Sequence, residues 1–373
     1  MKVRLGDYIN EYSVRNKADE DIPVYSVTNT QGFCRDYFGK EVASKDKTTY
    51  KIVPKGCFAY NPSRINVGSV DWQRTEDKVI VSPLYNVFCV SDEINKQYLY
   101  YYLKSDITLQ RIKTVATGSV RDNLKLDMLS EFPIELPNKK EQSLIVDILD
   151  KTKQVIALRK KELDALDNLI KARFVEMFGD ININDKNWKY EPLGELCTIV
   201  RGSSPRPIEQ FLGGDVPWIK IGDATDGDSI YLSSTKEHII QEGVKKSRLV
   251  KEGNLIFANC GVSLGFARII TFDGCIHDGW LAMEDIDERL DKVFLLQALN
   301  QMTEHFRAIA PAGTQPNLNT AIMKSYKQVI PPIELQREFI SFAKQVDKSK
   351  VKIQKSLDET QCLLDSLMQK YFG

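Results

Sequence analysis

The sequence lacks most features that mark membrane, secreted or zinc-binding proteins. No apolar run approaches the about 18 uninterrupted residues of a membrane span, and no signal-peptide pattern follows Met1. The 7 cysteines include no CxxC pair, and their odd number predicts free thiols in a reducing compartment. We therefore expect a cytoplasmic protein with reduced cysteines and no metal site.

Motifs of catalysis and cofactor binding are also missing. The 3 histidines are His238, His277 and His305, and no two of them have an HxxxH spacing. The sequence contains no GxxxxGK[ST] phosphate loop, no GxSxG turn and no nuclease carboxylate–lysine cluster. Two partial likenesses to methyltransferase signatures, EQFLGGD and NPSR, each lack residues that those motifs need. The sequence therefore predicts no catalytic residue and no cofactor on this chain.

An overall excess of charge is absent as well, because 51 Lys and Arg balance 51 Asp and Glu. The distribution is nevertheless uneven. Residues 35–74 hold eight basic and four acidic side chains, and residues 236–251 hold five and two, whereas residues 276–291 hold six acids and one arginine. Basic segments permit a polyanionic partner without requiring one, since ordinary solvated surface also has this composition.

What the sequence does contain is an internal duplication. A shift of 194 positions (318 − 124) aligns residues 124–179 with residues 318–373 without a gap. Gln142 then falls on Gln336, and Phe178-Gly179 falls on Phe372-Gly373. Upstream, RLGDYI, IPVYSV and VPKGCFAY are answered in the same order by PLGELC, VPWIKI and VKEGNLIF. The chain is therefore one unit of roughly 190 residues written twice, too long a period for a solenoid.

Each unit ends in a long predicted helix whose apolar residues recur every seven positions. Pro137 and Pro331 mark the starts, because proline is tolerated in a first helical turn. Such rows are typical of coiled-coil packing, although two helices buried in separate cores are the simpler alternative. The predicted coiled-coil positions are Leu149, Ile156, Leu163, Ile170 and Met177 in the first helix, and Phe339, Val346, Ile353, Leu357, Leu364, Leu367 and Tyr371 in the second.

Connectivity predicts that these helices are antiparallel. The first helix ends at Gly179, just before the second globular part begins, and the second helix starts where that part ends. The second helix can therefore pair with the first only by running back along it. Its end, Phe372-Gly373, should then pack against the first globular part. A glycine after each helix suits a left-handed C-cap.

The expected fold class is α+β. Two β-rich mixed globular domains are held apart by two long antiparallel coiled-coil helices, with a pseudo-two-fold internal duplication. Runs such as Lys78–Val90 favour strands, and Lys96–Ser105 favours a helix. We expect the first globular domain at residues 1–136, the first helix and a linker at 137–183, the second globular domain at 184–330, and the second helix at 331–373.

Three glycine-containing loops carry the residue types that contact DNA. They are YNPSRINVGS at residues 60–69, RGSSPRP at 201–207 and FANCGVSLGFAR at 257–268, and the first and last occupy equivalent places in the two units. Arg pairs with guanine, Asn with adenine, and Ser or Lys with phosphate oxygens. Asn, Ser and Gly also simply form turns, and any one loop taken alone favours that interpretation.

Taken in this order, the motifs resemble the specificity subunit of type I restriction–modification systems over essentially the whole chain. The resemblance rests on ELPNKKEQSLIVDIL and VIPPIELQREFISFA, on ATGSVRDNL and PAGTQPNL before them, and on WIKIGDA with IIQEGVKKSRLVKEGNLIFA. YNPSRINVGS with VSPLYNVF adds to it. The first unit departs more, because ATGSVRDNL lacks the Gln-Pro of its counterpart.

The resemblance implies a DNA-recognition subunit without catalysis of its own. Each globular domain would be a target recognition domain that reads one half of a bipartite, asymmetric site. The helices would set the spacer, capped near 17 base pairs by a helix of about 57 Å, and would bind two methyltransferase subunits. Adenosylmethionine, ATP and magnesium would be bound by those subunits and by motor–nuclease restriction subunits.

The predicted DNA contacts lie on the polar loops and basic segments. In the first unit they are Asn61, Ser63, Arg64 and Asn66, with Lys45, Lys47 and Lys51 on phosphates. In the second unit they are Arg201, Ser203, Ser204, Arg206, Lys220, Asn259 and Ser263, with Lys245, Lys246 and Arg248 on phosphates.

Two other functions stay open from the sequence. One is the recognition subunit of a type II-like restriction enzyme with a fused nuclease–methyltransferase, which neighbouring genes would distinguish. The other is a coiled-coil protein-interaction scaffold, which would show no salt-dependent binding to duplex DNA.

Overall fold

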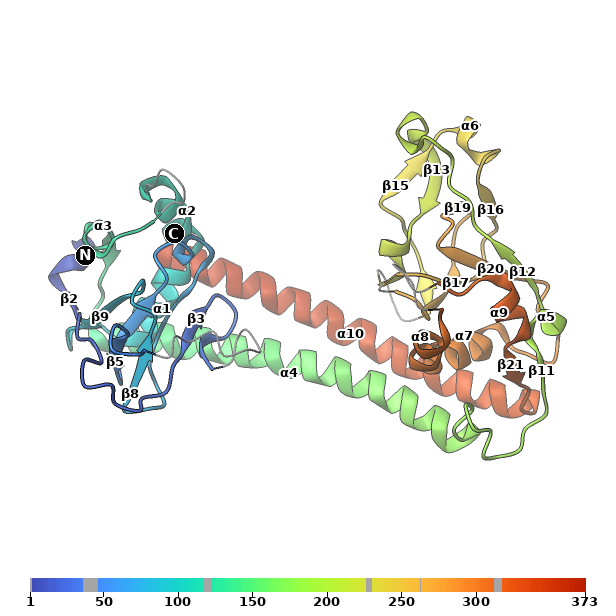
Figure 1. Ribbon diagram of the computed structural model, residues 1–373, viewed down its shortest axis with the longest axis horizontal. Coiled ribbons are helices and arrows are strands. Elements are labelled where there is room, and N and C mark those ends of the chain that lie inside the picture. The colour runs from blue at the N-terminus through green and yellow to red at the C-terminus, as the bar shows by residue number, and fades with distance from the viewer. Residues whose placement is uncertain (1, 36–45, 117–122, 226–229, 262, 312–316) are drawn as a thin grey trace. The chain divides into compact units, whose positions relative to one another are not determined.

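The computed structural model describes residues 2–35, 46–116, 123–225, 230–261, 263–311 and 317–373. Contacts within the chain divide it into two compact units. Unit 1 consists of Met1–Lys160 with Ser356–Gly373, and unit 2 of Lys161–Lys355. The long helices α4 (Lys139–Phe178) and α10 (Ile333–Phe372) each contribute to both units (Figure 1).

Unit 1 is β-rich, and its described residues form three short α-helices besides the long ones. Its strands are β1 (Lys2–Arg4), β2 (Ile9–Glu11), β3 (Ser26–Thr28), β4 (Gly32–Cys34), β5 (Lys51–Pro54), β6 (Phe58–Tyr60), β7 (Val70–Trp72), β8 (Lys78–Val81), β9 (Asn86–Val90) and β10 (Pro133–Glu135). Its short helices are α1 (Lys96–Lys104), α2 (Asp106–Val115) and α3 (Leu126–Ser130). The helix predicted at Lys96–Ser105 is thus confirmed as α1.

Unit 2 has the same kinds of element in the same order, with additions. Its strands are β11 (Tyr190–Pro192), β12 (Thr198–Arg201), β13 (Leu212–Ile219), β14 (Tyr231–Leu232), β15 (Glu237–Ile239), β16 (Arg248–Val250), β17 (Leu255–Ala258), β18 (Ala267–Ile270), β19 (Gly274–Ile276), β20 (Trp280–Glu284) and β21 (Lys327–Val329). Its short helices are α5 (Leu193–Leu196), α6 (Gln241–Val244), α7 (Lys292–Gln301), α8 (Thr303–Ile309) and α9 (Thr320–Ser325).

The main sheets of the two units share one strand order. In unit 1 the order is β2-β9-β6-β7, and in unit 2 it is β12-β20-β17-β18 with β14 added at the edge. A two-stranded sheet, β1–β10 or β11–β21, joins the start of each unit to the segment before its long helix. Every residue of β6 and β17 is buried, so FAY and LIFA are continuous apolar runs. The predicted duplication is therefore confirmed in three dimensions.

A buried glutamine fastens the start of α4 to unit 1. Gln142 Nε2 donates to the carbonyl oxygens of Glu93 (3.0 Å) and Pro137 (2.9 Å). Its Oε1 accepts a hydrogen bond from the backbone N–H of Asn95 at 2.7 Å. Asn95 is the N-cap of α1. The side chain therefore ties the first turn of α4 to the first turn of α1.

Gln336 makes the same three hydrogen bonds at the start of α10. Its Nε2 donates to the carbonyl oxygens of Arg289 (2.9 Å) and Pro331 (2.8 Å), and its Oε1 accepts from the backbone N–H of Asp291 at 2.8 Å. Asp291 is the N-cap of α7. Because both glutamines are buried, loss of either amide would leave backbone groups without a partner. We call these two residues the glutamine latches.

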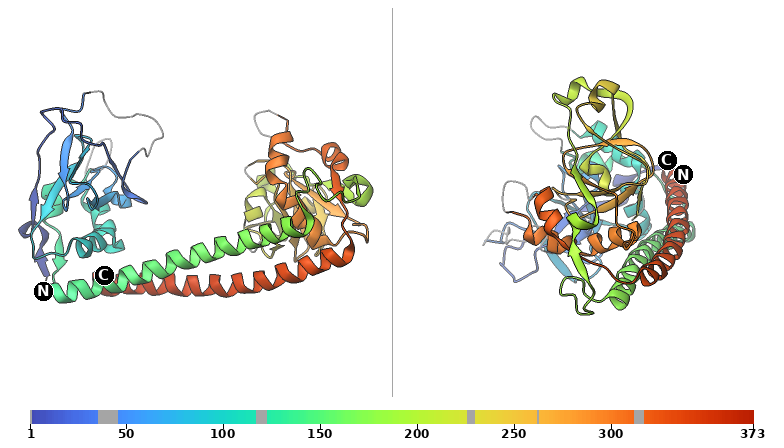
Figure 2. Two further views of the ribbon diagram at one scale, coloured as in Figure 1. Left: turned by 90° about the horizontal axis from the view of Figure 1, so that it is seen from below. Right: turned by 90° about the vertical axis from the view of Figure 1, so that its right-hand side faces the viewer.

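The two long helices run antiparallel, as predicted. In unit 2, Lys350 Nζ donates to Asp167 Oδ1 at 2.5 Å, and Arg173 donates to Glu338 Oε1 at 3.0 Å. Residue numbers thus rise along α4 while they fall along α10. Figure 2 shows the two helices side by side within each unit.

The predicted heptad positions form the inner faces of these helices. Eight are buried, namely Leu149, Ile156, Ile170, Met177, Phe339, Val346, Leu357 and Leu364. The other four, Leu163, Ile353, Leu367 and Tyr371, are half-buried. The alternative of two unpaired helices in separate cores is therefore wrong.

The repeated Phe-Gly ending has the same place in both units. Phe178 is fully buried, with its ring centre 4.8 Å from that of Phe294 on α7. Phe372 lies 5.1 Å from Tyr98 on α1 of unit 1. Gly179 has φ +75°, the left-handed conformation expected of a C-cap glycine. The end of α10 therefore belongs to the core of unit 1, as connectivity predicts.

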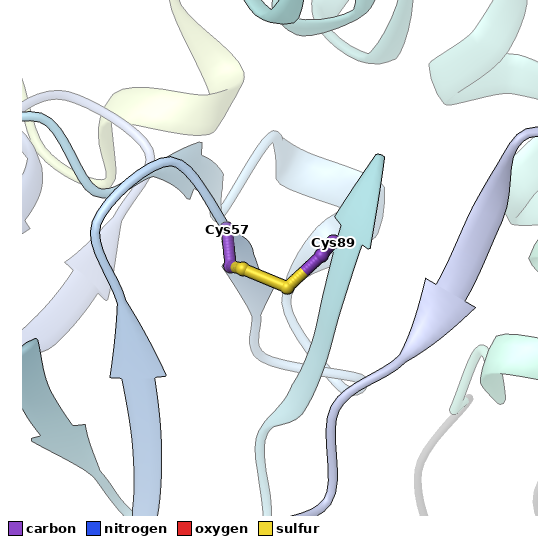
Figure 3. The surroundings of a disulfide bond; sticks show 2 residues. All are labelled: Cys57 and Cys89. Atoms are coloured by element: carbon purple, nitrogen blue, oxygen red, sulfur yellow. A yellow bond between two sulfur atoms is a disulfide. The ribbon is translucent and has the colours of Figure 1, made fainter. Parts of the chain in front are cut away.

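The prediction that every cysteine is a free thiol is wrong for two residues. Cys57 and Cys89 form a disulfide, with their Cα atoms 4.3 Å apart (Figure 3). In the β6–β9 pair Phe58 faces Phe88, so the two cysteines are directly opposed one step along the strands. A separation of 32 residues hides this pairing from a search for CxxC. The remaining cysteines, Cys34, Cys197, Cys260, Cys275 and Cys362, are free.

The three domain boundaries drawn from the sequence, at residues 136/137, 183/184 and 330/331, stay a prediction. They separate each globular part from the helix and linker segments. The compact units instead divide the helices themselves, at Lys160/Lys161 and Lys355/Ser356. Each half-helix therefore belongs, by its contacts, to the unit whose core it completes.

Candidate nucleic-acid interface

In unit 2 the RGSSPRP loop lies against the turn between β19 and β20. The backbone N–H groups of Gly202 and Ser203 donate to the carbonyl oxygens of Trp280 (2.9 Å) and Ile276 (3.1 Å). A Cβ atom on Gly202 would stand 2.1 Å from the carbonyl oxygen of His277. Only glycine allows this close approach, which fixes the loop on the turn.

Asp278, in that turn, binds the polar side chains of the loop. Its Oδ1 accepts a hydrogen bond from Ser204 Oγ at 2.8 Å, and its Oδ2 lies 3.6 Å from the Arg206 guanidinium. Its backbone carbonyl accepts from Arg201 Nε at 3.0 Å. Partial burial acts to raise the pKa of Asp278, but the bond from Ser204 and the charges of His277 and Arg206 hold it below its ordinary value. The carboxylate is therefore charged at neutral pH.

His277 lies beside Asp278 in the same turn. Its Nδ1 accepts from the Gly279 N–H at 2.9 Å, so a neutral imidazole carries its proton on Nε2, which faces Asp278 Oδ1 at 2.9 Å. Burial lowers the pKa of His277, Asp278 opposes that effect, and the nearby Lys220 and Arg206 add to it.

A second basic segment joins the same surface. Ser203 Oγ donates to the carbonyl oxygen of Lys246 at 3.2 Å, and Ser247 Oγ donates to that of Ser203 at 2.6 Å. The Lys246 ammonium lies over the Phe211 ring, 4.7 Å from its centre. Lys245 and Arg248 are exposed, and their side chains make no hydrogen bond or ion pair within the described ranges.

Three other predicted residues of unit 2 lie elsewhere or are engaged. Lys220 Nζ donates to Glu237 Oε1 at 2.5 Å, beside the turn. Asn259 is 0% exposed, and its amide donates to Asn317 Oδ1 and to the carbonyl oxygen of Leu318. Ser263 is also buried. Asn259 and Ser263 therefore support the loop from within and are not at the surface.

In unit 1 the loop at residues 61–69 joins β6 to β7, the place that residues 259–266 occupy in unit 2. Asn61 Oδ1 accepts from the backbone N–H and hydroxyl of Ser63, at 3.1 and 2.9 Å, which closes a turn. Asn66 is half-buried. Arg64 is exposed, and its guanidinium makes no hydrogen bond or ion pair with any described residue. Arg64 is thus the accessible basic group of this loop.

The lysines predicted on phosphates in unit 1 differ in availability. Lys51 Nζ donates to the carbonyl oxygen of Tyr85 at 2.7 Å, and burial lowers its pKa. Lys47 is 4.0 Å from Asp21 Oδ1. Lys45 lies outside the described residues.

The structure thus gathers most of the predicted residues of unit 2 and fewer of those of unit 1. Arg201, Ser203, Ser204, Arg206 and Lys246, together with Arg248 and Lys220, surround one turn. We call this set the unit 2 surface. Sequence reasoning missed Asp278 at its centre, because the residue opens the acidic stretch 276–291. The one available signal was an HDG turn between two apolar segments.

A model of the type I restriction modification DNA specificity domain matches this chain twice, at residues 2–168 and 185–360. The chain belongs to that family. The first match begins at β1, the second begins shortly before β11, and each runs into a long helix, so the duplicated unit is one specificity domain.

Relatives of this specificity protein are similar along most of their length. The type I restriction enzyme MjaIX specificity subunit of Methanocaldococcus jannaschii is 23% identical over 341 residues, which cover 86% of this chain and 77% of the relative. The StySPI specificity subunit of Salmonella potsdam is 20% identical and covers 99% and 86%. The family resemblance inferred from the sequence is therefore confirmed.

Solved specificity proteins have the same fold. A structure determined to explain complex assembly and conformational transition of a type I restriction–modification system matches with a TM-score of 0.66 at 17% identity, covering 100% of this chain and 97% of that one. The type I S subunit of M. genitalium matches with a TM-score of 0.56, also at 17% identity, covering 100% and 96%. The expected α+β fold with two duplicated domains and packed long helices is confirmed.

Two further findings concern membrane-spanning helices and metal-binding clusters. Among the described residues, no helix is long and apolar enough to cross a membrane. Within the same ranges, no group of three His, Cys, Asp or Glu side chains is placed to hold a metal ion.

Proposed function

We propose that this specificity protein reads a bipartite, asymmetric DNA target, with one half read by each unit. The observation that carries the proposal is that two units with the same frame present unlike surfaces at corresponding places. The loop after β6 exposes Arg64, whereas the equivalent loop after β17 is closed by the buried Asn259. Like frames with unlike surfaces are what two readers of different half-sites need.

In unit 2 the bases would be read by the RGSSPRP loop. The Arg206 side chain is 78% exposed, and its ion pair with Asp278 is long at 3.6 Å. An exposed ion pair of this kind contributes about 0–1 kcal/mol, so DNA can displace it. Arginine on a guanine edge makes two parallel hydrogen bonds in the major groove. Lys245 and Arg248 would contact the flanking phosphates.

In unit 1 the base contact would come from Arg64. Its guanidinium is exposed at the tip of a turn that Asn61 and Ser63 hold closed. Lys47 has only a distant partner and is available to phosphate, whereas Lys51 serves a backbone carbonyl. Lys51 is therefore less available to bind phosphate than Lys47.

The long helices would set the length of the unread spacer between the half-sites. Each has 40 residues, which at about 1.5 Å per residue gives about 60 Å. Insertion of one heptad in each helix, after Lys160 and after Lys355, adds about 10 Å, or about 3 base pairs. The methylated motif should then gain about 3 unread positions; an unchanged spacer would refute the role of helix length.

The outer face of α4 in unit 1 would bind a methyltransferase subunit. Leu144, Val155 and Leu158 are exposed by 59%, 38% and 56%. At about 100° per residue they lie within an arc of about 60° on one face. Apolar side chains aligned on an otherwise charged helix indicate a protein contact.

The corresponding positions on α10 would form a weaker second docking surface. Counted 194 residues on, they are Glu338, Ser349 and Lys352, all polar. The first methyltransferase subunit should therefore bind more tightly than the second. Leu158→Lys should reduce the amount of the first subunit bound in sedimentation, with Lys352→Ala as the matched control. An equal loss in both variants would contradict this assignment.

Catalysis would reside on the partner chains. In this proposal the methyltransferase subunits bind adenosylmethionine, and motor–nuclease subunits bind ATP and magnesium. The support is the absence of catalytic motifs in the sequence and of a metal-type cluster among the described side chains. The purified chain alone should transfer no labelled methyl group to DNA, and adding the methyltransferase subunit should start the transfer.

Methylome sequencing of cells with and without this chain tests the proposed function as a whole. The expected result is a motif of two short specific halves separated by unread bases, present only with the chain. A continuous motif, or methylation that does not depend on the chain, would refute the proposal.

A further inference from the structure

Asp278 has the contacts of a residue that organises a recognition surface without touching DNA. All of its polar atoms on the side chain are directed at groups of its own unit, namely Ser204, His277 and Arg206. Its charge is negative, and a phosphate backbone would repel it. Of the side chains that it contacts, His277 and Arg206 are basic and Ser204 is neutral. A direct contact with DNA is therefore the poorer explanation for its position.

Three constraints meet in the turn that carries this residue. Ser204 is held by a 2.8 Å bond to the carboxylate, Arg201 by a 3.0 Å bond to the backbone carbonyl, and the loop backbone by the close approach of Gly202 to His277. Arg201 and Arg206 would repel each other without an anion between them. The carboxylate thus offsets that repulsion and, through a weak ion pair at 3.6 Å, favours one direction of the Arg206 side chain before DNA binds.

We propose that Asp278 is the positioning residue of the unit 2 surface: it orients Ser204 and Arg206 for base reading and contributes no DNA contact itself. This inference rests on the proposed function and deepens it. Pre-oriented side chains lose less conformational freedom when they bind, and that gain is specific to the correct base. Without Asp278 the same arginines remain, but they sample many directions and attract any sequence.

The inference makes an unusual prediction for Asp278→Ala. Removal of a negative charge that lies beside Arg206 should leave binding to random duplex DNA unchanged or stronger. Discrimination at the unit 2 half-site should fall by about fivefold, the lower end of the effect of one base contact. A merely structural residue would instead weaken both kinds of binding together.

The experiment uses the full chain in complex with its methyltransferase partner. Binding is measured to the cognate duplex, to a duplex altered in one half-site, and to a random duplex. The half-site read by unit 2 is the one that Arg206→Ala relaxes. Asp278→Asn, which keeps an acceptor for Ser204 but loses the charge, should show an intermediate loss of discrimination. Leu84→Ala is the matched control in unit 1, since Leu84 stands two residues before β9 as Asp278 stands before β20.

The possible outcomes separate the two claims. Lost discrimination with retained or increased random binding supports the positioning role. Full discrimination in Asp278→Ala, or a parallel loss of specific and random binding with a lowered Tm, overturns it while leaving the proposed function intact. A wild-type complex with no preference in either half-site would refute the proposed function itself, and this inference with it.

Discussion

Unit 1 and unit 2 share a frame and differ in what that frame presents. In unit 1 the turn before β9 exposes Leu84, which is 79% accessible. In unit 2 the corresponding turn before β20 carries Asp278, which binds a loop of arginines and serines. The sheet order and the glutamine latches are nevertheless the same in both units.

The difference teaches which parts of a recognition unit can vary independently. The frame is held by buried groups with exact hydrogen-bonding needs, so changes there cost folding free energy. The turns and loops at the sheet ends are exposed and cost little to change. A chain can therefore keep its fold in both halves while each half acquires a different target.

The largest effect on this comparison should come from the phenylalanines that end the long helices. Phe178→Ala should lower the free energy of unfolding by about 4 kcal/mol, because it leaves a cavity among packed rings. Phe372→Ala should cost less, since Phe372 contacts two tyrosines at the end of a helix. Hydrogen–deuterium exchange should locate each loss in a different unit, α7 for Phe178 and α1 for Phe372. Protection lost in the same unit by both variants would contradict the layout.

The glutamine latches should show the next largest effect. Gln142→Ala and Gln336→Ala each remove three hydrogen bonds from a buried place and should lower the free energy of unfolding by about 3 kcal/mol. Urea titration measures the loss. The surface variant Gln154→Ala on α4 serves as control. If the loss in the free energy of unfolding differed by more than about twofold between the two variants, the two frames would not be energetically equivalent.

A smaller effect is expected for lysines that contact phosphates. Lys245→Ala should reduce the slope of log K against log salt by about 1 for every DNA sequence. Lys51→Ala should change the slope little, because its ammonium already binds Tyr85. Lys251→Ala, with Asp273 as its partner, is the matched control within unit 2. Equal slopes for Lys245→Ala and the wild type would remove Lys245 from the interface.

The smallest effect is a pH dependence confined to unit 1. Burial lowers the pKa of Lys104 to about 8, and nearby Lys153 adds to the shift while Asp71 opposes it. The pKa of a lysine in the unfolded chain is about 10.4. Between pH 8 and that value the unfolded state therefore binds more protons than the folded state. The stability of unit 1 should therefore rise as the pH increases from 8 to 10.

Unit 2 offers the contrast for this pH effect, because Asn300 occupies the ninth place after the N-cap of α7, as Lys104 does after that of α1. Exchange protection of α1, but not of α7, should increase at pH 10. Lys104→Met should abolish the increase. An unchanged increase in that variant would assign it to other groups.

The duplicated frame was predictable because the order of apolar and turn residues along the chain repeats. The 194-residue shift already paired Gln142 with Gln336 and Phe178 with Phe372, and heptad spacing gave the inner faces of the helices. These features depend on local periodicity and on connectivity, both of which a sequence contains.

The recognition surface was only partly predictable, because its members meet through tertiary structure. Loop composition pointed to Arg206 and Arg64, but it gave no sign that Asn259 is buried. Asp278 and the Cys57–Cys89 disulfide were not predicted for the same reason: each contact joins residues that are far apart in the sequence. Charge counting even placed Asp278 in an acidic segment apart from the basic loop that it holds.

The most direct test of two independent readers is the methylated motif of cells carrying Arg64→Ala or Arg206→Ala in place of the wild-type chain. The account predicts that each variant relaxes one position, by about 1–3 kcal/mol of discrimination, and that the two positions lie in opposite halves of the motif. Relaxation of the same half by both variants, or an unchanged motif in both, would contradict it.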